Sequence, residues 1–332
     1  MTQRGAVKGN MMSSLPQPLL SNPAAAHAVV VGGGTMGADV AVVLARAHCR
    51  TTVIEPDATR AQALPARVAA NLAAAGRAEA ADYVQTAPDL DSVDWNSVGL
   101  VIECIPERLD LKQALFAELE QRAPARAILA SNSSSFPISA IGQGLKTRDR
   151  MLGLHFFMPA HLVPLVEVVL CDASDPAQAD ALIAFMRRCG MVPVKVLKDL
   201  PGFLANRLQH ALSREAFDLI DRGIASPEDV DAAVRFGFGF RFLAAGPVLQ
   251  RDHAGIEVHA AAGATMYPSF CNSDTPARCL TERAADGRHG MKAGQGFYEW
   301  TPESIAAERA RYDRLLRAGL DLIADELPPI EP

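Results

Sequence analysis

The sequence predicts an α/β fold in which an open, parallel sheet is followed by an all-α C-terminal domain. Short apolar runs alternate with helical stretches from His27 to about residue 199, and from there on helical patterns follow one another. The chain has 332 residues, 49% of them apolar, which is enough for one large or two ordinary domains with hydrophobic cores. We expect a disordered leader (1–26), a sheet domain (27–199), a helical domain (200–300) and a C-terminal helix with a tail (301–332).

The first expected element is a strand that ends in a glycine turn. The segment HAVVVGGGTMG begins with the apolar run Ala28 to Val31 and leads into an Ala- and Val-rich helix from Met36 to Ala47. Its glycines fit the spacing G-x-G-x-x-G, in which a tight turn, a close approach to pyrophosphate and close helix packing each require one glycine. The segment therefore predicts a Rossmann-type dinucleotide-binding domain whose cofactor-binding turn includes Gly32, Gly34, Thr35, Met36 and Gly37.

A second strand, Thr51 to Ile54, ends at Glu55, eighteen residues after Gly37. A carboxylate at this place can accept hydrogen bonds from a ribose 2′-hydroxyl and repels a 2′-phosphate. No basic residue follows before Arg60. The pattern favours NAD over NADP, the alternative being a solvated glutamate at the end of a strand.

The remaining strands are followed by polar residues. Leu100 to Ile105 precedes Glu107, and the helix after it, Leu109 to Gln121, carries Lys112 near its start. Ala127 to Ala130 leads into five polar residues, 131–135, and a strand from Met151 ends at His155. Ligands of parallel α/β sheets bind beyond the carboxyl ends of the strands, so these side chains share one edge. The serines of 131–135 also fit a turn or a helix cap equally well.

Helices dominate the second half of the chain. The sequence predicts helices from Asp199 to about Asp221, from Ser226 onward, from Gly255 to Met266 and from Thr301 to about Ala324. Between the second and third of these, Gly237 to Gly246 is expected to be a loop. An earlier helix, Thr59 to Ala75, is expected to kink or restart at Pro65.

Composition narrows the class of protein. The net charge of −6 is modest and mixed, which gives no support for nucleic acid binding or for a basic membrane-facing surface. No apolar run approaches the roughly 18 residues that span a bilayer, so we expect a soluble protein. The six cysteines show no C-x-x-C pair and no metal spacing, so we expect no metal site and a reducing cytoplasm as the setting.

A nicotinamide cofactor at this edge implies hydride transfer, which needs a base for the alcohol proton and donors for the forming carbonyl. His155 is the best candidate for the base, because imidazole titrates near pH ~6.5 and a carboxylate can orient it. Glu167, inside an apolar run, needs a partner and could be that carboxylate. Ser134 and Asn206 are the nearest uncharged donors, although other polar residues compete with them.

Seven segments in one order resemble the 3-hydroxyacyl-CoA dehydrogenase family. They are GGGTMG, PERLDLK, SNSSS, HFFMP, PLVEVV, PGFLANR and GQGFYEW, within residues 27–300. The resemblance implies an NAD-dependent enzyme that oxidises an (S)-3-hydroxyacyl-CoA to the 3-ketoacyl-CoA and forms a homodimer through its helical domain. It also implies that His155 is the catalytic base, Glu167 its partner, and Ser134 and Asn206 the substrate-contacting pair. Cofactor contacts carried over by position are Glu55, Glu107, Lys112 and Lys292.

Two departures leave the substrate open. Met158 stands where the family usually has an asparagine near the cofactor, and the region after the second strand lacks the lysine-rich insert that receives CoA. Arg60, Arg67 and Arg77 could replace those lysines, but a solvated helix face is the better interpretation. The short insert is similar to the branch that acts on CoA-free 3-hydroxy acids such as carnitine and L-gulonate, whereas HFF favours the acyl-CoA side slightly. A non-catalytic protein like the lens crystallin of this family is the third possibility.

Overall fold

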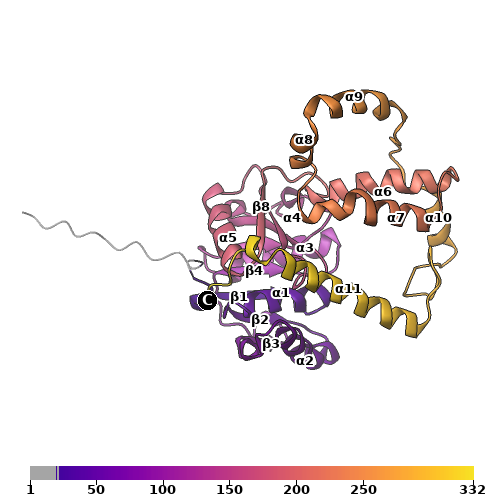
Figure 1. The fold of residues 1–332 in the computed structure, drawn as a ribbon. Helices are drawn as coiled ribbons and strands as arrows, with labels where there is room; N and C mark the ends of the chain where they lie inside the picture. Colours follow the sequence, from indigo (N-terminus) through magenta and orange to yellow (C-terminus); the bar gives the residue numbers. More distant parts are fainter. Residues whose placement is uncertain (1–19, 21) are drawn as a thin grey trace, which may run out of the picture.

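The computed structural model describes residue 20 and residues 22–332, and most of the predicted leader lies outside this range. The described chain forms one eight-stranded sheet followed by a helical region (Figure 1). The strand order is β3-β2-β1-β4-β5-β6-β7-β8, which confirms the predicted dinucleotide-binding type of sheet. The strands are β1 (His27–Val31), β2 (Arg50–Ile54), β3 (Val84–Ala87), β4 (Leu100–Glu103), β5 (Ile128–Ser131), β6 (Met151–Phe156), β7 (Leu165–Val169) and β8 (Val192–Val196).

The last strands of the sheet depart from the expected parallel arrangement. Strands β1 to β6 are parallel, but β7 runs antiparallel to β6. Only residues 157–164 connect these two strands, and a parallel crossover needs a dozen or more residues. The register places His155 directly opposite Glu167, so both side chains point to the same face. The sequence reasoning also missed the short edge strands β3 and β8.

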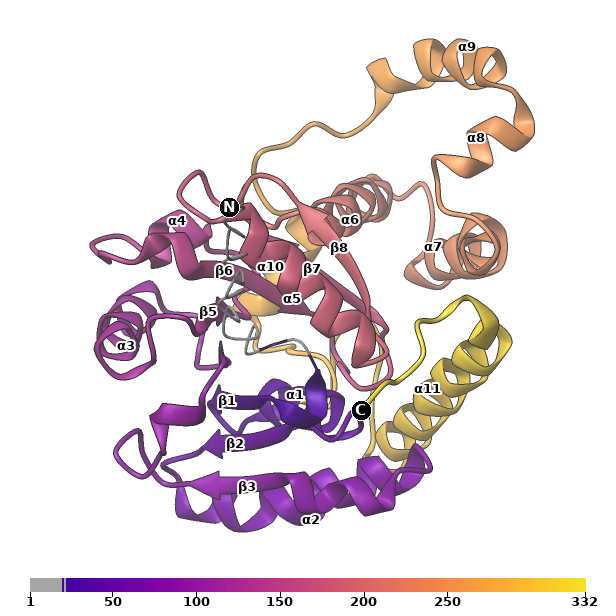
Figure 2. The same cartoon turned by 90° about the vertical axis from the view of Figure 1, so that its left-hand side faces the viewer.

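Helices cover both faces of the sheet. Alternate residues of β1 divide between two cores: Ala28 and Val30 pack with α1, α2 and α5, while Val29 and Val31 pack with α3 and α4. Figure 2 shows α3 and α4 on one side of the sheet and α5 on the other. The sheet helices are α1 (Thr35–Ala45), α2 (Ala58–Ala74), α3 (Leu109–Arg122), α4 (Ile138–Ile141) and α5 (Pro176–Arg188). Helix α2 continues through Pro65 instead of restarting there.

The first helix of the helical region begins at Ala205, six residues later than the predicted start at Asp199. Leu204 is the N-cap of the first helix, because residues 201–204 form turns in which Gly202 and Phe203 have positive φ. The predicted loop at 237–246 is instead largely helical: the chain kinks at Gly237, whose φ and ψ are not helical, and continues as a 3-10 helix at Gly239–Leu243. The helices are α6 (Ala205–Asp221), α7 (Pro227–Ala232), α8 (Leu249–Ala254), α9 (Ile256–Met266), α10 (Arg278–Ala285) and α11 (Pro302–Leu322).

The last helix returns the chain to the sheet. Thr301 is the N-cap of α11, where the sequence predicted the helix to start, and it forms a capping box with Ser304. Arg317 near the end of α11 donates a hydrogen bond to the carbonyl of Ala74 in α2 (3.2 Å). Ile330 then packs against the sheet core and pairs with Cys189 in an isolated bridge. Within the described residues, no helix combines the length and the apolar character that crossing a membrane requires.

Candidate active site

The glycine turn between β1 and α1 is shaped for a phosphate group. Gly32 has φ +105°, and a Cβ there would lie 2.7 Å from the carbonyl oxygen of Cys104. A Cβ on Gly37 would lie 1.8 Å from the carbonyl oxygen of Gly32, so only glycine lets α1 lie this close to the turn. Gly34 faces open space, and no side chain caps α1, so its first N–H groups remain available to an anion. The residues present fit the pyrophosphate of NAD.

Glu55 lies against this turn. Its side chain is 3% exposed, and Oε2 accepts a hydrogen bond from the backbone N–H of Gly33 (3.1 Å). Oε1 accepts from the N–H of Asp57 and from the Arg60 guanidinium, both at 2.9 Å. The carboxylate is therefore held at the end of β2, where an adenosine ribose would bind.

The two strands β6 and β7 bring His155 and Glu167 together. The Nδ1 atom of His155 lies 2.8 Å from Oε2 of Glu167, and both side chains are almost completely buried. With Nδ1 donating to the carboxylate, Nε2 is left free to accept a proton. The rings of Phe157 and Phe203 pack against the imidazole at centroid distances of 4.5 and 5.6 Å. The geometry is that of an oriented general base.

The same glutamate connects the sheet to the helical region. The other oxygen of Glu167, Oε1, accepts hydrogen bonds from the N–H groups of Leu204 (3.0 Å) and Ala205 (2.7 Å) at the start of α6. The positive end of the helix dipole therefore stabilises the carboxylate that orients His155. The next residue, Asn206, donates from Nδ2 to the carbonyl of Ser134 (3.4 Å). All four residues predicted for the reaction lie within this chain of contacts.

Two further predicted cofactor residues, Glu107 and Lys112, belong to one hydrogen-bonded network. Glu107 Oε1 accepts hydrogen bonds from the hydroxyls of Ser133 (2.6 Å) and Ser135 (2.8 Å) and from the N–H of Ser134 (3.2 Å). Burial raises the pKa of Glu107, but these hydrogen bonds and the nearby Lys112 charge outweigh it and lower the pKa to about 2. Glu107 thus carries a charge at neutral pH and fixes the loop after β5.

Lys112 is 1% exposed and acts within this network. Its Nζ lies 2.6 Å from Glu103 and 3.1 Å from Glu107. Glu103 also accepts from the hydroxyl of Ser131 (2.6 Å); burial raises its pKa, and Lys112 opposes that effect. The sequence analysis gave Glu103 no role, although a carboxylate inside an apolar strand needs a buried partner and is therefore a recognisable signal. It also missed Asn132, whose side-chain oxygen accepts from the N–H of Phe156 (2.9 Å).

The structure does not bring Lys292 to the other predicted cofactor residues. The loop between α10 and α11 that carries it lies at the far end of the helical region from the sheet (Figure 1). There Lys292 lines a separate pocket with Arg283 and Phe297. Met158, at the asparagine position, is 65% exposed and has no side-chain amide that could hold a cofactor.

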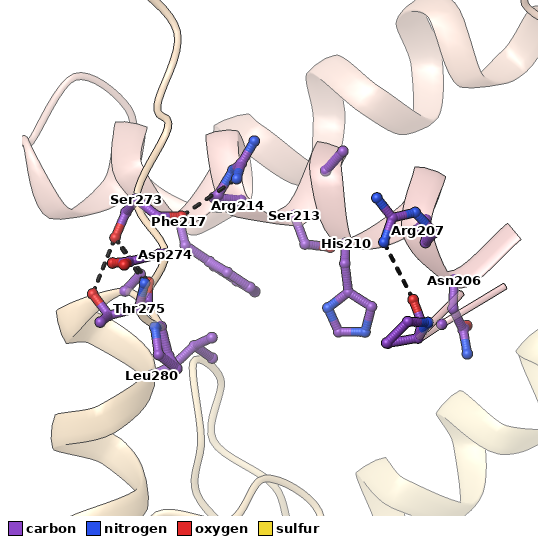
Figure 3. A pocket seen from close by; sticks show the side chains of 15 residues that line it. Asn206, Arg207, His210, Ser213, Arg214, Phe217, Ser273, Asp274, Thr275 and Leu280 are labelled. Carbon is purple, nitrogen blue, oxygen red and sulfur yellow. Dashed lines mark hydrogen bonds between the residues drawn. The ribbon is translucent and has the colours of Figure 1, made fainter. Parts of the chain in front are cut away.

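A pocket of about 600 Å³ lies next to Asn206 (Figure 3). One wall is α6, and the other is formed by residues 273–277 and Leu280. Arg207 donates to the carbonyl of Pro201 and Arg214 to that of Ser273, each at 3.3 Å, while His210 points into the space between the walls. The pocket therefore offers cationic and polar groups beside the predicted reaction residues.

A dinucleotide-binding sheet that places a buried histidine–carboxylate pair at its ligand edge defines a nicotinamide-dependent dehydrogenase. Comparison with known proteins identifies the dehydrogenase family to which the chain belongs. Residues 27–200 match the NAD binding domain of 3-hydroxyacyl-CoA dehydrogenase, and residues 202–300 match the C-terminal domain of the same enzyme. The chain belongs to the 3-hydroxyacyl-CoA dehydrogenase family and is an NAD-dependent oxidoreductase, as the sequence motifs predicted.

Relatives within the family act on different substrates. The chain is 32% identical over 290 residues to the 5-formyl-3-hydroxy-2-methylpyridine 4-carboxylate 5-dehydrogenase of Mesorhizobium japonicum, covering 85% of this chain and 94% of that one. It is also 32% identical over 290 residues to the human mitochondrial hydroxyacyl-coenzyme A dehydrogenase (82% and 91% covered).

Two solved structures of relatives differ in how closely they superpose on this chain. The structure of a 5-formyl-3-hydroxy-2-methylpyridine 4-carboxylic acid 5-dehydrogenase, an NAD⁺-dependent dismutase, matches with a TM-score of 0.85 at 29% identity over 90% of this chain and 98% of that chain. The (S)-3-hydroxybutyryl-CoA dehydrogenase of Ralstonia eutropha matches with a TM-score of 0.68 at 28% identity over 83% and 99%.

Proposed function

We propose that this enzyme oxidises a hydroxyl group on a small carboxylate substrate that carries no CoA, and reduces the corresponding carbonyl in the reverse direction. The observation that carries this proposal is the pocket beside Asn206, whose Arg207, His210 and Arg214 suit a carboxylate. The closer superposition with the pyridine carboxylate dehydrogenase than with the hydroxybutyryl-CoA enzyme supports the same substrate class.

The arginines that could bind the phosphates of CoA also favour a substrate without CoA. Arg60 is paired with Glu55 and Arg67 with the buried Asp39, each at 2.9 Å, so neither guanidinium is free for the phosphates of a thioester. Between Lys8 and Lys112 the sequence contains no lysine at all. A substrate held by its own carboxylate needs none of these groups.

In the proposed reaction, Nε2 of His155 accepts the proton of the substrate hydroxyl as the carbonyl forms. Glu167 holds the imidazole through Nδ1 and stabilises its positive charge, and the start of α6 stabilises Glu167 in turn. Ser134 and Asn206 hold the substrate oxygen while its charge changes. The glycine turn, Glu55, Glu107 and Lys112 are the residues that would hold NAD, which would supply the hydride acceptor when bound.

The second candidate is the oxidation of an (S)-3-hydroxyacyl-CoA. Both halves of the chain match domains of 3-hydroxyacyl-CoA dehydrogenase, and HFF (155–157) resembles the acyl-CoA side of the family. In this case the acyl group would occupy the pocket beside Asn206, and CoA would bind through groups other than Arg60 and Arg67.

A reductive assay with NADH separates these candidates. Acetoacetyl-CoA, acetoacetate, dehydrocarnitine and 5-formyl-3-hydroxy-2-methylpyridine 4-carboxylate are compared at equal concentration. We expect kcat/KM for at least one free acid to exceed that for the thioester by ~10-fold or more. Preference for acetoacetyl-CoA would contradict the proposal and favour the second candidate. No turnover of any compound, despite NADH binding, would favour a crystallin-like role.

We also propose that the enzyme is a homodimer formed through its helical region, residues 205–300. Helix α6 has no fully buried residue, and large apolar side chains such as Leu208 (58% exposed) and Phe240 (70% exposed) face solvent. Residues 249–269, with α8 and α9, extend away from the rest of the chain in Figure 1. A second copy of the chain would cover these surfaces.

Light scattering after gel filtration tests the dimer. We expect about twice the chain mass of 35.4 kDa. Replacing Phe240 by Asp should shift the protein toward the monomer, whereas Phe297→Leu, at a side chain that stacks on Phe217 within the same chain, should leave the mass unchanged. A monomer in the unmodified protein would contradict the proposal.

A further inference from the structure

One basic side chain, Arg60, lies against the carboxylate that is placed for the adenosine ribose. It is in the first turn of α2, and its Nη2 atom lies 2.9 Å from Oε1 of Glu55. The guanidinium side chain is 60% exposed, whereas Glu55 is 3% exposed. Arg60 therefore covers the solvent side of Glu55, at the place where a ligand would meet that carboxylate.

The other contacts of Glu55 fix it in this orientation. Oε2 accepts from Gly33 in the glycine turn, and Oε1 is shared between the N–H of Asp57 and Arg60. A Cβ on Gly33 would lie 2.9 Å from that of Glu55, so turn and carboxylate are packed against each other. Anything that binds the turn through its pyrophosphate thus brings its ribose to both Glu55 and Arg60.

These two side chains have opposite preferences for the ribose. A carboxylate accepts hydrogen bonds from a free 2′-hydroxyl and repels a 2′-phosphate, while a nearby arginine accommodates the phosphate. In the native chain the guanidinium is bound to Glu55, so its charge is already compensated. Removing the charge of Glu55 would release Arg60 without moving it away.

We propose that Arg60 is a specificity-determining residue for the cofactor. Paired with Glu55, it supports binding of the free ribose of NAD; without the carboxylate charge, it binds the 2′-phosphate of NADP. The inference rests on the proposed contact of Glu55 with the ribose and does not depend on the substrate.

Cofactor binding by the full-length protein tests this directly, through titration of NADH and NADPH fluorescence without substrate. We expect the native protein to bind NADH more tightly than NADPH by ~100-fold. Glu55→Gln retains the side-chain volume and should raise NADPH affinity by ~30-fold while lowering NADH affinity. Adding Arg60→Ala to Glu55→Gln should remove most of that gain, and Arg77→Ala in the same background should not.

The outcomes separate the two assignments. Equal NADPH affinity of Glu55→Gln with and without Arg60→Ala would overturn the role of Arg60. Unchanged affinity for both cofactors in Glu55→Gln would instead refute the ribose contact of Glu55. A second variant, Glu55→Ser, covers the case in which Gln keeps Arg60 engaged through its amide oxygen, and thermal melts confirm that each variant is folded. A steep loss of NADPH binding with added salt in Glu55→Gln, absent in the double variant, supports a phosphate contact.

Discussion

The sheet region (residues 27–196) and the helical region differ in where they place their apolar side chains. Strand β1 buries all five of its residues, and two cores fill both faces of the sheet. In the helical region, α6 and α7 contain no fully buried residue, and neither does α11 after it, although α6 and α11 are amphipathic. The sheet region is thus stabilised from within, whereas the helical region leaves apolar surface exposed.

The predicted reaction residues lie where these two regions meet. His155 and Glu167 belong to the sheet, but Glu167 is bound by the first N–H groups of α6, and Asn206 follows directly. The base therefore has its position set by the rigid sheet and its electrostatic environment set partly by the helical region. Variants on either side should accordingly affect different quantities: catalysis at the junction and stability within the sheet.

The largest effect is expected for His155→Gln. Loss of the general base should lower kcat by ~10³-fold, because glutamine cannot accept the hydroxyl proton. NADH binding should stay nearly unchanged, since the glycine turn and Glu55 lie on other strands. Steady-state kinetics and NADH fluorescence titration measure both quantities.

The control for this variant is His253→Gln, at an exposed histidine of α8, which should keep full activity. Glu167→Gln should also lower kcat, by less than His155→Gln, because the base remains but its positive charge is no longer stabilised. Retention of activity in His155→Gln would remove this residue from its proposed role.

Much of the sheet region and of the site could be predicted, because local signals determine them. The glycine turn, the polar ends of β2 and β6 and the family motifs all lie within short segments. The antiparallel pairing of β7 was missed, although the short 157–164 connection would have implied it. Edge strands such as β3, with only Ala87 buried, carry too weak an apolar pattern to be found.

The helical region was harder to predict, since few of its apolar side chains are buried within the chain and its local patterns leave the packing undetermined. Helical turns that kink at Gly237 and continue as a 3-10 helix stand where a glycine-rich loop was expected. Lys292 was assigned to the cofactor by position in the family, but the loop that carries it lies far from the sheet in this chain. Most of the residues assigned by resemblance thus lie together at the edge of the sheet, whereas Lys292 lies apart from them.

A second prediction concerns the buried charges of the sheet region. Glu103→Gln should lower the free energy of unfolding by about 3 kcal/mol, because it leaves the fully buried ammonium of Lys112 with Glu107 as its remaining carboxylate. Thermal melts at fixed protein concentration measure this loss. Glu282→Gln, which removes an exposed pair with Arg278 in the helical region, should cost less than ~0.5 kcal/mol.

The double variant Glu103→Gln/Lys112→Met tests whether the unpaired charge of Lys112 causes the loss of stability in Glu103→Gln. It should recover part of the loss, because no buried ammonium is left without its partner. If the double variant is less stable than Glu103→Gln, the two residues contribute through packing rather than through charge.

The smallest effect should appear only below neutral pH, at His27 in β1. Its ring is 4% exposed and lies between the hydroxyls of Ser97 and Thr52, both at 2.9 Å. Burial, together with the nearby charge of Arg50, lowers the pKa of His27 from 6.5 to about 4. The unfolded chain thus binds a proton between these values that the folded chain does not, so stability is fully present above pH 6.5 and is lost as the pH falls toward 4.

This shift should make the protein about 2 kcal/mol less stable at pH 5 than at pH 7 through His27 alone. His27→Gln keeps a polar side chain that can bond both hydroxyls but does not titrate, so its stability should fall less steeply over this range. His253→Gln, at an exposed side chain of α8, should follow the native curve. Parallel curves for the native protein and His27→Gln would show that the acid sensitivity of the sheet region arises from other groups.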